Sequence, residues 1–301
     1  MSESQLEIHI TTKNRWQELQ FTLTQLRLQE GYEHARIVVF DDGSTDNTSN
    51  LLAVHFPEVE RLRNEKSRGL IHCRNYMLNN CRAEFAISLD DDAHFVDKSV
   101  FKYIQKSFEN EQVGVLAFRI FWGKQLPENT AHAQSSERVQ SFVGCGHAWR
   151  LSVWRQIENY PAWWKFYGEE DFAAYQLYKR NIYILYQPNV FVQHRVEVKS
   201  RKNDSDYQQR LRRAWRAGWF LMLLFYPLNV FFRSFAYSVF TQFKNRIFKS
   251  EPQAIKPMLL AIIDFLLAIP RLLKNRKSLT KKEFYEFQRL PSAKIYWTPN
   301  S

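Results

Sequence analysis

The alternation of apolar runs with helix-like segments in the first half of the chain constrains the fold most. The runs at 35–40 and 84–89 are almost continuously apolar, which is typical of strands buried on both faces of a sheet. Around them, apolar residues recur at helical spacing over 15–28, 47–55 and 70–80. Strands that alternate with helices at this spacing predict an α/β fold with a mostly parallel sheet.

The same patterns predict further elements. Strands are expected at 6–11, 113–121 and 190–193, and helices at 100–108 and 171–179. Asn14 is expected to cap the first helix, because an asparagine side chain accepts hydrogen bonds from the free N–H groups of a helix start.

Polar residues follow three of the predicted strands directly. They are Thr11 to Lys13, the pair Asp41 and Asp42, and the run from Asp90 to Asp92. In parallel α/β sheets, ligands bind beyond the carboxyl ends of the strands. We therefore expect these three loops to meet in one site.

The run Asp90, Asp91 and Asp92 is the most acidic of these loops. Adjacent carboxylates raise one another's pKa unless a cation compensates their charge. Such oxygen ligands suit Mg²⁺ or Mn²⁺, which commonly bridge substrate phosphates. The alternative is a solvated turn or a helix cap, and the buried strand before the run disfavours it.

The segment from Asp41 to Thr48 reads DDGSTDNT. Gly43 permits a tight turn, and Ser44, Thr45 or Asp46 could cap the next helix. A carboxylate at this strand end can accept a hydrogen bond from a nucleobase N–H group. The alternative is an ordinary turn from strand to helix.

The last third of the chain is strongly basic. Residues 195–301 hold 21 of the 42 Lys and Arg residues but only 7 of the 31 Asp and Glu residues. This asymmetry favours an anionic partner, either nucleic acid or phospholipid.

Two apolar stretches, 219–232 and 258–269, lie between basic clusters in this third. Both are shorter than the roughly 20 residues that a spanning helix needs, and Asn229 and Arg233 disfavour a span over 218–240. The composition is typical of interfacial helices on an anionic membrane. The alternative is a helical cap buried against the sheet domain. The interleaved aromatic residues include Trp215, Trp219, Phe232, Tyr237 and Phe240.

Two features favour the cytoplasmic side of a membrane. Residues 1–7 lack the basic start and apolar stretch of a signal peptide. Three cysteines without paired spacing fit a reducing compartment. We expect a cytoplasmic protein, peripheral to the inner face of the membrane.

Several segments together carry a resemblance to a known family. The chain resembles the inverting glycosyltransferases of family 2, of the bacterial cell-envelope type. The resemblance covers about residues 5–195, and the pairing of DDGSTDNT with a later LDDD is its most specific part. It implies a GT-A domain over 1–200, followed by a basic, amphipathic, helical extension over 201–301. The segments are IHITTKN (8–14), VVFDDGSTDNT (38–48), GLIHCRN (69–75), LDDDAHF (89–95), GCGHAWR (144–150) and YGEEDF (167–172).

The resemblance also implies roles for single residues. Asp42 matches the carboxylate that reads the nucleobase, and Asp90 and Asp92 match the ends of the D-x-D signature. Asp92, His194 and Asp90 are the expected ligands of Mn²⁺ or Mg²⁺. The nucleotide-sugar contacts are expected at Thr11, Lys13, Asp42, Arg74, Asp90 and Asp91.

Glu169 to Asp171 resembles the family's Glu-Asp motif, which supplies the general base. Asp171 is favoured over Glu170 as the catalytic base. The alternative is an acidic first turn that favours the helix dipole. Sugar rings stack on aromatic faces, so an acceptor site is expected at Trp163, Trp164 and Tyr167; the alternative for each is ordinary packing.

The resemblance implies transfer of a sugar, with inversion, from a nucleotide-diphosphate sugar to an acceptor hydroxyl. The expected partners are this donor, a glycan or lipid-linked acceptor, and an anionic membrane contacted through residues 205–301, with no nucleic acid. One alternative is a nucleotidyltransferase, although 11–15 contains no glycine for a phosphate loop. The other is a non-enzymatic, basic, nucleic-acid-binding protein. Glu169 to Asp171 argues against an inactive family member.

Overall fold

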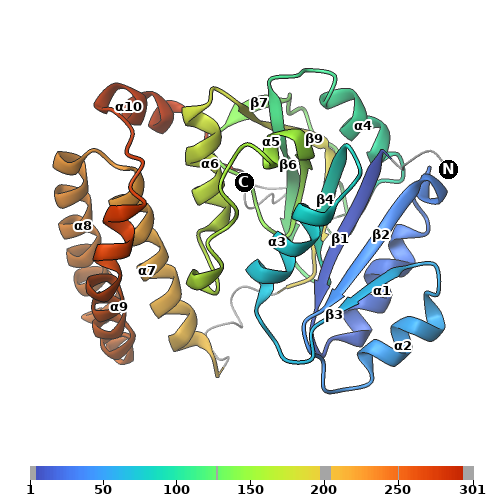
Figure 1. Ribbon diagram of the computed structural model, residues 1–301, viewed down its shortest axis with the longest axis horizontal. Helices are drawn as coiled ribbons and strands as arrows, with labels where there is room; N and C mark the ends of the chain where they lie inside the picture. Colours follow the sequence, from blue (N-terminus) through green and yellow to red (C-terminus); the bar gives the residue numbers. More distant parts are fainter. Residues whose placement is uncertain (1–4, 127, 197–204, 250, 294–301) are drawn as a thin grey trace.

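The computed structural model describes residues 5–126, 128–196, 205–249 and 251–293. A mixed sheet with helices on both faces is followed by a layer of C-terminal helices, which lies beside α6 and away from α1 and α2 (Figure 1). The α/β prediction is confirmed.

The sheet has the strand order β3-β2-β1-β4-β8-β6-β9-β5, and β7 pairs with β9. β1 to β4 are mutually parallel, as are β6 and β9, while β8 runs antiparallel between β4 and β6. The bounds are β1 (Leu6–Thr12), β2 (Ala35–Asp41), β3 (Glu60–Arg63), β4 (Phe85–Asp90), β5 (Ala93–Phe95), β6 (Val113–Trp122), β7 (Glu137–Val139), β8 (Gly146–Arg150) and β9 (Tyr183–His194).

Helices cover the two faces of the sheet with separate apolar cores. One core joins the strands to α1, α2 and α4, and the other joins them to α3, α5, α6 and the C-terminal helices. The bounds are α1 (Trp16–Leu26), α2 (Thr48–His55), α3 (Leu70–Asn80), α4 (Val100–Ser107), α5 (Leu151–Trp154), α6 (Glu169–Lys179), α7 (Tyr207–Phe225), α8 (Leu228–Gln242), α9 (Ile255–Lys274) and α10 (Lys281–Arg289).

The predicted strands and helices are present, with two differences of extent. β9 begins at Tyr183 rather than at 190, because a register shift between Phe118 and Arg119 lets β6 pair with β9 on both sides of residues 188–190. α6 begins at Glu169, two residues earlier than expected. The strands β3, β5, β7 and β8 were not predicted from the sequence; they have three to five residues each, too few to show a period.

Asn14 does not cap α1, so this prediction is wrong. The N-cap is Arg15, without a side-chain cap bond, and Asn14 has a φ of 54°. Its side-chain oxygen instead accepts the N–H of Thr45 at 2.7 Å, and its own N–H donates to Ser44 Oγ at 2.9 Å. Asn14 thereby joins the loops after β1 and β2.

α7 packs against the sheet domain, as the buried-cap alternative expects. Phe220 lies 5.2 Å from Trp163 and 5.5 Å from Trp164 between ring centroids, and Phe225 stacks on Tyr175 at 4.8 Å. The interfacial placement of Trp215 and Trp219 is therefore wrong, since both indoles are buried. The expected domain boundary at residue 200 lies outside the described residues.

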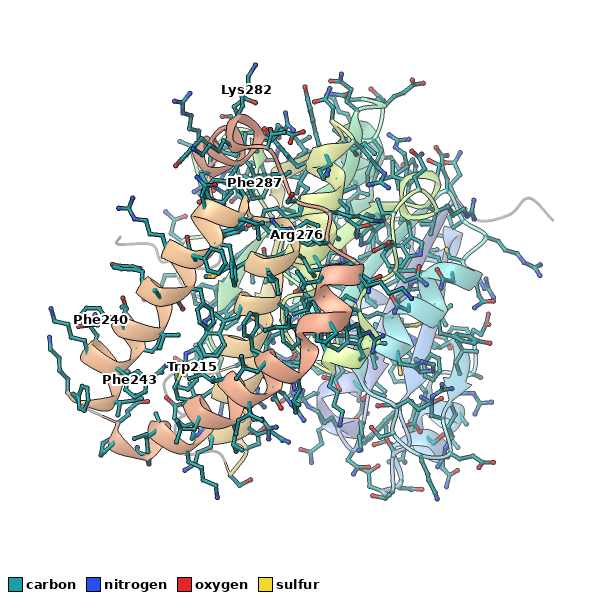
Figure 2. All side chains as sticks on the ribbon, turned by 60° about the vertical axis from the view of Figure 1, so that its left-hand side comes forward. Trp215, Phe240, Phe243, Arg276, Lys282 and Phe287 are labelled. Atoms are coloured by element: carbon teal, nitrogen blue, oxygen red, sulfur yellow. The ribbon has the colours of Figure 1, made fainter. Side chains whose placement is uncertain are left out.

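α8 and α9 differ from α7 because they leave many apolar side chains exposed. Phe231 is the side chain of α8 that is buried, whereas Phe240 and Leu267 are 60% and 77% exposed. Figure 2 shows Phe240 at the outer edge of the C-terminal helices, with Trp215 between helices. Within the described residues, no helix is both long enough and apolar enough to cross a membrane. The exposed apolar residues of this surface are Leu228, Phe232, Tyr237, Phe240, Phe248, Ile255, Leu259, Ile263, Leu266, Leu267 and Leu273.

Candidate active site

A cleft of about 1080 Å³ opens at the carboxyl ends of β1, β2 and β4. The parallel register sets Thr11 beside both Phe40 and Asp90, so the three polar loops meet at one edge as expected. The predicted site residues that line the cleft are Thr11, Lys13, Asp42, Arg74, Asp90, Asp91, Asp92, Tyr167, Glu170, Asp171 and His194.

The acidic run meets His194 because the chain turns back after β4. β5 pairs antiparallel with β9, which sets Ala93 opposite His194. The N–H of Arg195 donates to the backbone oxygen of Asp92 at 2.9 Å. As a result, His194 Nε2 lies 3.0 Å from Asp92 Oδ1 and 4.0 Å from Asp90 Oδ2.

These three side chains fit a divalent metal. One ligand atom from each of Asp90, Asp92 and His194 lies within 4.8 Å of the others. Asp92 Oδ1 is buried, and among the described residues no donor meets it in hydrogen-bond geometry, which a cation would remedy. Burial alone would raise the pKa of Asp92, but His194 and Arg15 lower it below its usual value, so the carboxylate stays ionised.

Asp91 has a different environment from its two neighbours. Its carboxylate accepts the Thr12 hydroxyl at 2.8 Å and pairs with Arg15 Nη1 at 3.0 Å. Arg15 also reaches Asp92 at 2.7 Å. Burial is the largest effect on Asp91 and raises its pKa to about 7. Sequence reasoning missed Arg15, because nothing in its spacing marks it as the partner of a run 76 positions later.

Asp42 lines the cleft, but protein donors already occupy its carboxylate. It accepts Asn64 Nδ2 at 2.7 Å, Ser67 Oγ at 2.6 Å, and the backbone N–H groups of Arg68 and Gly69 at 2.8 and 2.9 Å. Burial opposes ionisation, yet these bonds lower the pKa of Asp42 overall. Asp42 thus fixes the loop before α3, and a nucleobase would have to displace one of four donors.

Arg74 links the acidic run to the start of α6. Its guanidinium is buried and pairs with Asp90 at 2.8 Å, Glu169 at 3.3 Å and Glu170 at 3.5 Å. It also donates to the backbone oxygen of Gly144 at 2.7 Å. Arg74 was expected to contact the nucleotide. In the structure its guanidinium joins the acidic run to the acidic start of α6.

α6 begins at the cleft wall with three acidic residues. Gly168 provides the left-handed turn before it, with a φ of 84°. Burial raises the pKa of Glu170 well above its usual value and also raises the pKa of Asp171. Glu170 packs so closely on Gly144 that a Cβ there would lie 2.0 Å from its Oε1. Asp171, unlike Glu170, makes no ion pair with Arg74 among the described residues.

The aromatic residues expected at the acceptor site are divided by the structure. Tyr167 lines the cleft. Trp164 is 1% exposed and packs on Phe172 and Phe220, and Trp163 lies under the guanidinium of Arg271. Packing accounts for the contacts of both tryptophans, and neither of them lines the cleft.

The C-terminal segment contributes cleft residues that sequence reasoning did not place there. Arg210 and Arg213 of α7 line the cleft, as do Ser292 and Ala293 after α10. Gln140 holds Ser292 and Ala293 near the cleft, because its backbone N–H donates to the backbone oxygen of Pro291 at 2.9 Å. The sequence shows that 210–216 is basic, but the direction in which each arginine side chain points depends on how α7 packs.

Comparison with known families shows which family the chain belongs to. The model of glycosyl transferase family 2 matches residues 7–183. The chain belongs to glycosyl transferase family 2. Its curated relatives include an uncharacterized glycosyltransferase, YfnE, of Bacillus subtilis (strain 168), which is 32% identical over 116 residues. That match covers 38% of this chain and 29% of the relative's length.

Solved structures of glycosyltransferases share the GT-A fold of this family 2 chain. S. aureus TarS 1-349 in complex with UDP has a TM-score of 0.59 at 17% identity, covering 90% of this chain and 83% of that one. The mannosyltransferase PcManGT of Pyrobaculum calidifontis, in complex with GDP-Man and Mn²⁺, has a TM-score of 0.55 at 15% identity, covering 96% and 84%. Membership of glycosyl transferase family 2 favours glycosyl transfer over the nucleotidyltransferase and non-enzymatic alternatives.

Proposed function

We propose that this glycosyltransferase moves a sugar from a nucleotide-diphosphate donor to an acceptor hydroxyl with inversion, in dependence on Mn²⁺ or Mg²⁺. The observation that carries the proposal is one cleft with Asp90, Asp92 and His194 together on one wall. Glu170 and Asp171 line the same cleft. Inverting transfer needs both a site for the diphosphate leaving group and a carboxylate base for the acceptor.

Asp90, Asp92 and His194 would hold the metal. A divalent ion bound there supplies positive charge that stabilises a diphosphate leaving group. Thr11 and Lys13 lie at the end of β1, where they would contact the nucleotide. Asp42 serves the same pocket by fixing residues 67–69, because it accepts the Ser67 hydroxyl and the backbone N–H groups of Arg68 and Gly69.

Asp171 is the proposed general base, with Glu170 as the alternative. It takes the proton of the acceptor hydroxyl while that oxygen forms a bond to the anomeric carbon. The bond from that carbon to the diphosphate breaks, and the leaving group keeps the electron pair. Asp171 is favoured because Arg74 holds the carboxylate of Glu170 in an ion pair, and no such pair engages Asp171 among the described residues.

The acceptor is proposed to be a glycan or a lipid-linked molecule in the synthesis of a cell-surface polysaccharide or glycolipid. The protein would work in the cytoplasm, peripheral to the inner face of the membrane. Exposed apolar residues of α8 and α9, with the surrounding Lys and Arg residues, support an anionic membrane as the partner.

Thermal unfolding with nucleoside diphosphates tests the proposal. UDP or GDP with Mn²⁺ should raise Tm by about 5 °C at a hundredfold excess over Kd, which corresponds to about 2.7 kcal/mol. Asp92→Ala should abolish the metal-dependent part of the shift and lower activity about 100-fold or more. Stabilisation that is the same with EDTA, or full activity in Asp92→Ala, would remove the metal from the mechanism.

A further inference from the structure

The arginines of α7 are divided between two faces of the helix. Residues advance by about 100° each, so Arg210 and Arg213 share one face while Arg212 and Arg216 share another, centred about 110° away. The contacts follow this division. Arg212 and Arg216 pair with Asp264 of α9 at 2.6 and 3.2 Å, whereas Arg210 and Arg213 line the active-site cleft.

Arg210 and Arg213 keep hydrogen-bond donors for a ligand. The Nε of Arg210 donates to both carboxylate oxygens of Asp206, at 2.8 and 2.9 Å, which leaves further N–H groups on a guanidinium that has five. Over the described ranges, Arg213 has no ion pair or hydrogen bond, and its side chain is partly exposed.

The position of α7 sets these arginines next to the proposed base. A Cβ added at Gly168, the residue before α6, would lie 3.2 Å from Ala217 Cβ, so α7 passes directly over the start of α6. Lys165 and Tyr167, in the loop before Gly168, line the cleft as well. Lys165, Arg210 and Arg213 therefore lie on the wall of the cleft where the acceptor hydroxyl must approach Asp171 or Glu170.

The proposed metal site at Asp90, Asp92 and His194 serves the donor diphosphate, so an uncharged acceptor would leave the three cations of this wall without an anionic ligand. These cations are Lys165, Arg210 and Arg213. Glu169, Glu170 and Asp171 make the wall acidic, and an anion would be repelled without compensation. The guanidinium fork matches two phosphate oxygens at once. We propose that Arg210 and Arg213, together with Lys165, bind a phosphate ester carried by the acceptor. This inference rests on the proposed glycosyl transfer and names the chemical class of its acceptor.

Binding of glycerol 3-phosphate tests the site without any turnover. The full chain in EDTA, which removes metal-dependent diphosphate binding, should bind this phosphate monoester saturably in calorimetry or tryptophan fluorescence. Arg213→Ala should weaken binding about tenfold, the amount expected for one charge-assisted contact. Arg213→Lys should restore part of the affinity. Arg212→Ala, the matched control with the same charge change on the other face of α7, should change affinity less than twofold.

Three outcomes would overturn the proposal. The first is that the unchanged protein does not bind glycerol 3-phosphate saturably. The second is that Arg212→Ala and Arg213→Ala lose equal affinity for it. The third is that Arg213→Ala weakens only the binding to vesicles of phosphatidylglycerol and leaves the affinity for glycerol 3-phosphate unchanged. The last would assign the arginines to the membrane surface. Binding of UDP with Mn²⁺ is measured on the same variants. Its absence from all of them would contradict the proposed function, while the glycerol 3-phosphate result would still decide the arginine site.

Discussion

At the scale of single residues, buried carboxylates are distinguished by their partners. Asp42 is saturated by four protein donors, and Asp91 is paired with Arg15 and Thr12. Asp92 Oδ1 is buried without a hydrogen-bond donor among the described residues, and the exposed Asp171 makes no ion pair there. Identical functional groups thus differ in availability, and availability decides which of them can bind a metal or accept a proton.

Asp171→Asn tests the assignment of the base. Loss of the general base should lower kcat about 100- to 10,000-fold, while Kd for UDP with Mn²⁺ stays unchanged. Glu170→Gln is the matched control. A larger loss of kcat in Glu170→Gln than in Asp171→Asn would transfer the role to Glu170.

The pH profile of kcat provides a second measurement of the same base. A base acts only when deprotonated, so activity is lost as pH falls through its pKa. Burial raises the pKa of Asp171, so the acidic limb of kcat should lie above the ordinary aspartate value of about 3.9. A limb at or below that value would contradict the assignment.

At the scale of elements, α7 joins the sheet domain to the outer helices. One face packs on the residues before α6 and on α6 itself, through Phe220 and Phe225. Another face binds Asp264, which explains an acidic residue inside the apolar stretch of α9. Arg276 donates to the backbone oxygens of Leu223 and Tyr226 and so satisfies the end of α7.

Asp264→Asn should destabilise the packing of α7 against α9. Loss of this mostly buried, charged acceptor should cost about 1.5–3 kcal/mol in the free energy of unfolding, measured by urea denaturation. Arg212 and Arg216 lower the pKa of Asp264 against the effect of burial, so its contribution is present above about pH 4 and is lost as pH falls through the lowered pKa. Glu286→Gln, at an exposed pair with Lys282, should cost less than about 0.5 kcal/mol. Equal costs for the two variants would show that Asp264 is not the anchor.

At the scale of the whole molecule, the helix that forms part of the cleft wall, α6, shares one continuous apolar core with α8 and α9. The cluster that contains Phe172 of α6 also contains Trp219 of α7 and Phe265 of α9. A membrane bound to α8 and α9 would therefore be held in a fixed relation to the cleft. This arrangement suits an enzyme whose acceptor is anchored in the same membrane.

Replacement of the outer apolar side chains tests this surface. Phe240→Ser combined with Leu267→Ser removes two highly exposed apolar groups and should lower the binding constant for vesicles of phosphatidylglycerol about tenfold or more, measured by cosedimentation. Val54→Ser, on α2 and 72% exposed, is the control and should have no effect. Vesicle binding that is equal in all three proteins would contradict the membrane proposal.

The sequence alone determined the α/β class, the loops at the strand ends and the acidic motifs, because these depend on local periodicity and on neighbouring residues. The elements it missed, such as β5 and β8, are short and owe their stability to strands distant along the chain. Membership of the family added the expectation that His194 would join Asp90 and Asp92.

Only the tertiary structure decided where side chains point. It directed Arg15 and Arg74 to carboxylates far along the chain, buried Trp164, and turned two arginines of α7 into the cleft. These outcomes follow from how helices and strands pack against one another. The residue type at one position gives the chemistry of its side chain but does not say which residues surround it. The acidic run was therefore legible in the sequence, whereas the partners that make Asp91 and Asp92 differ were not.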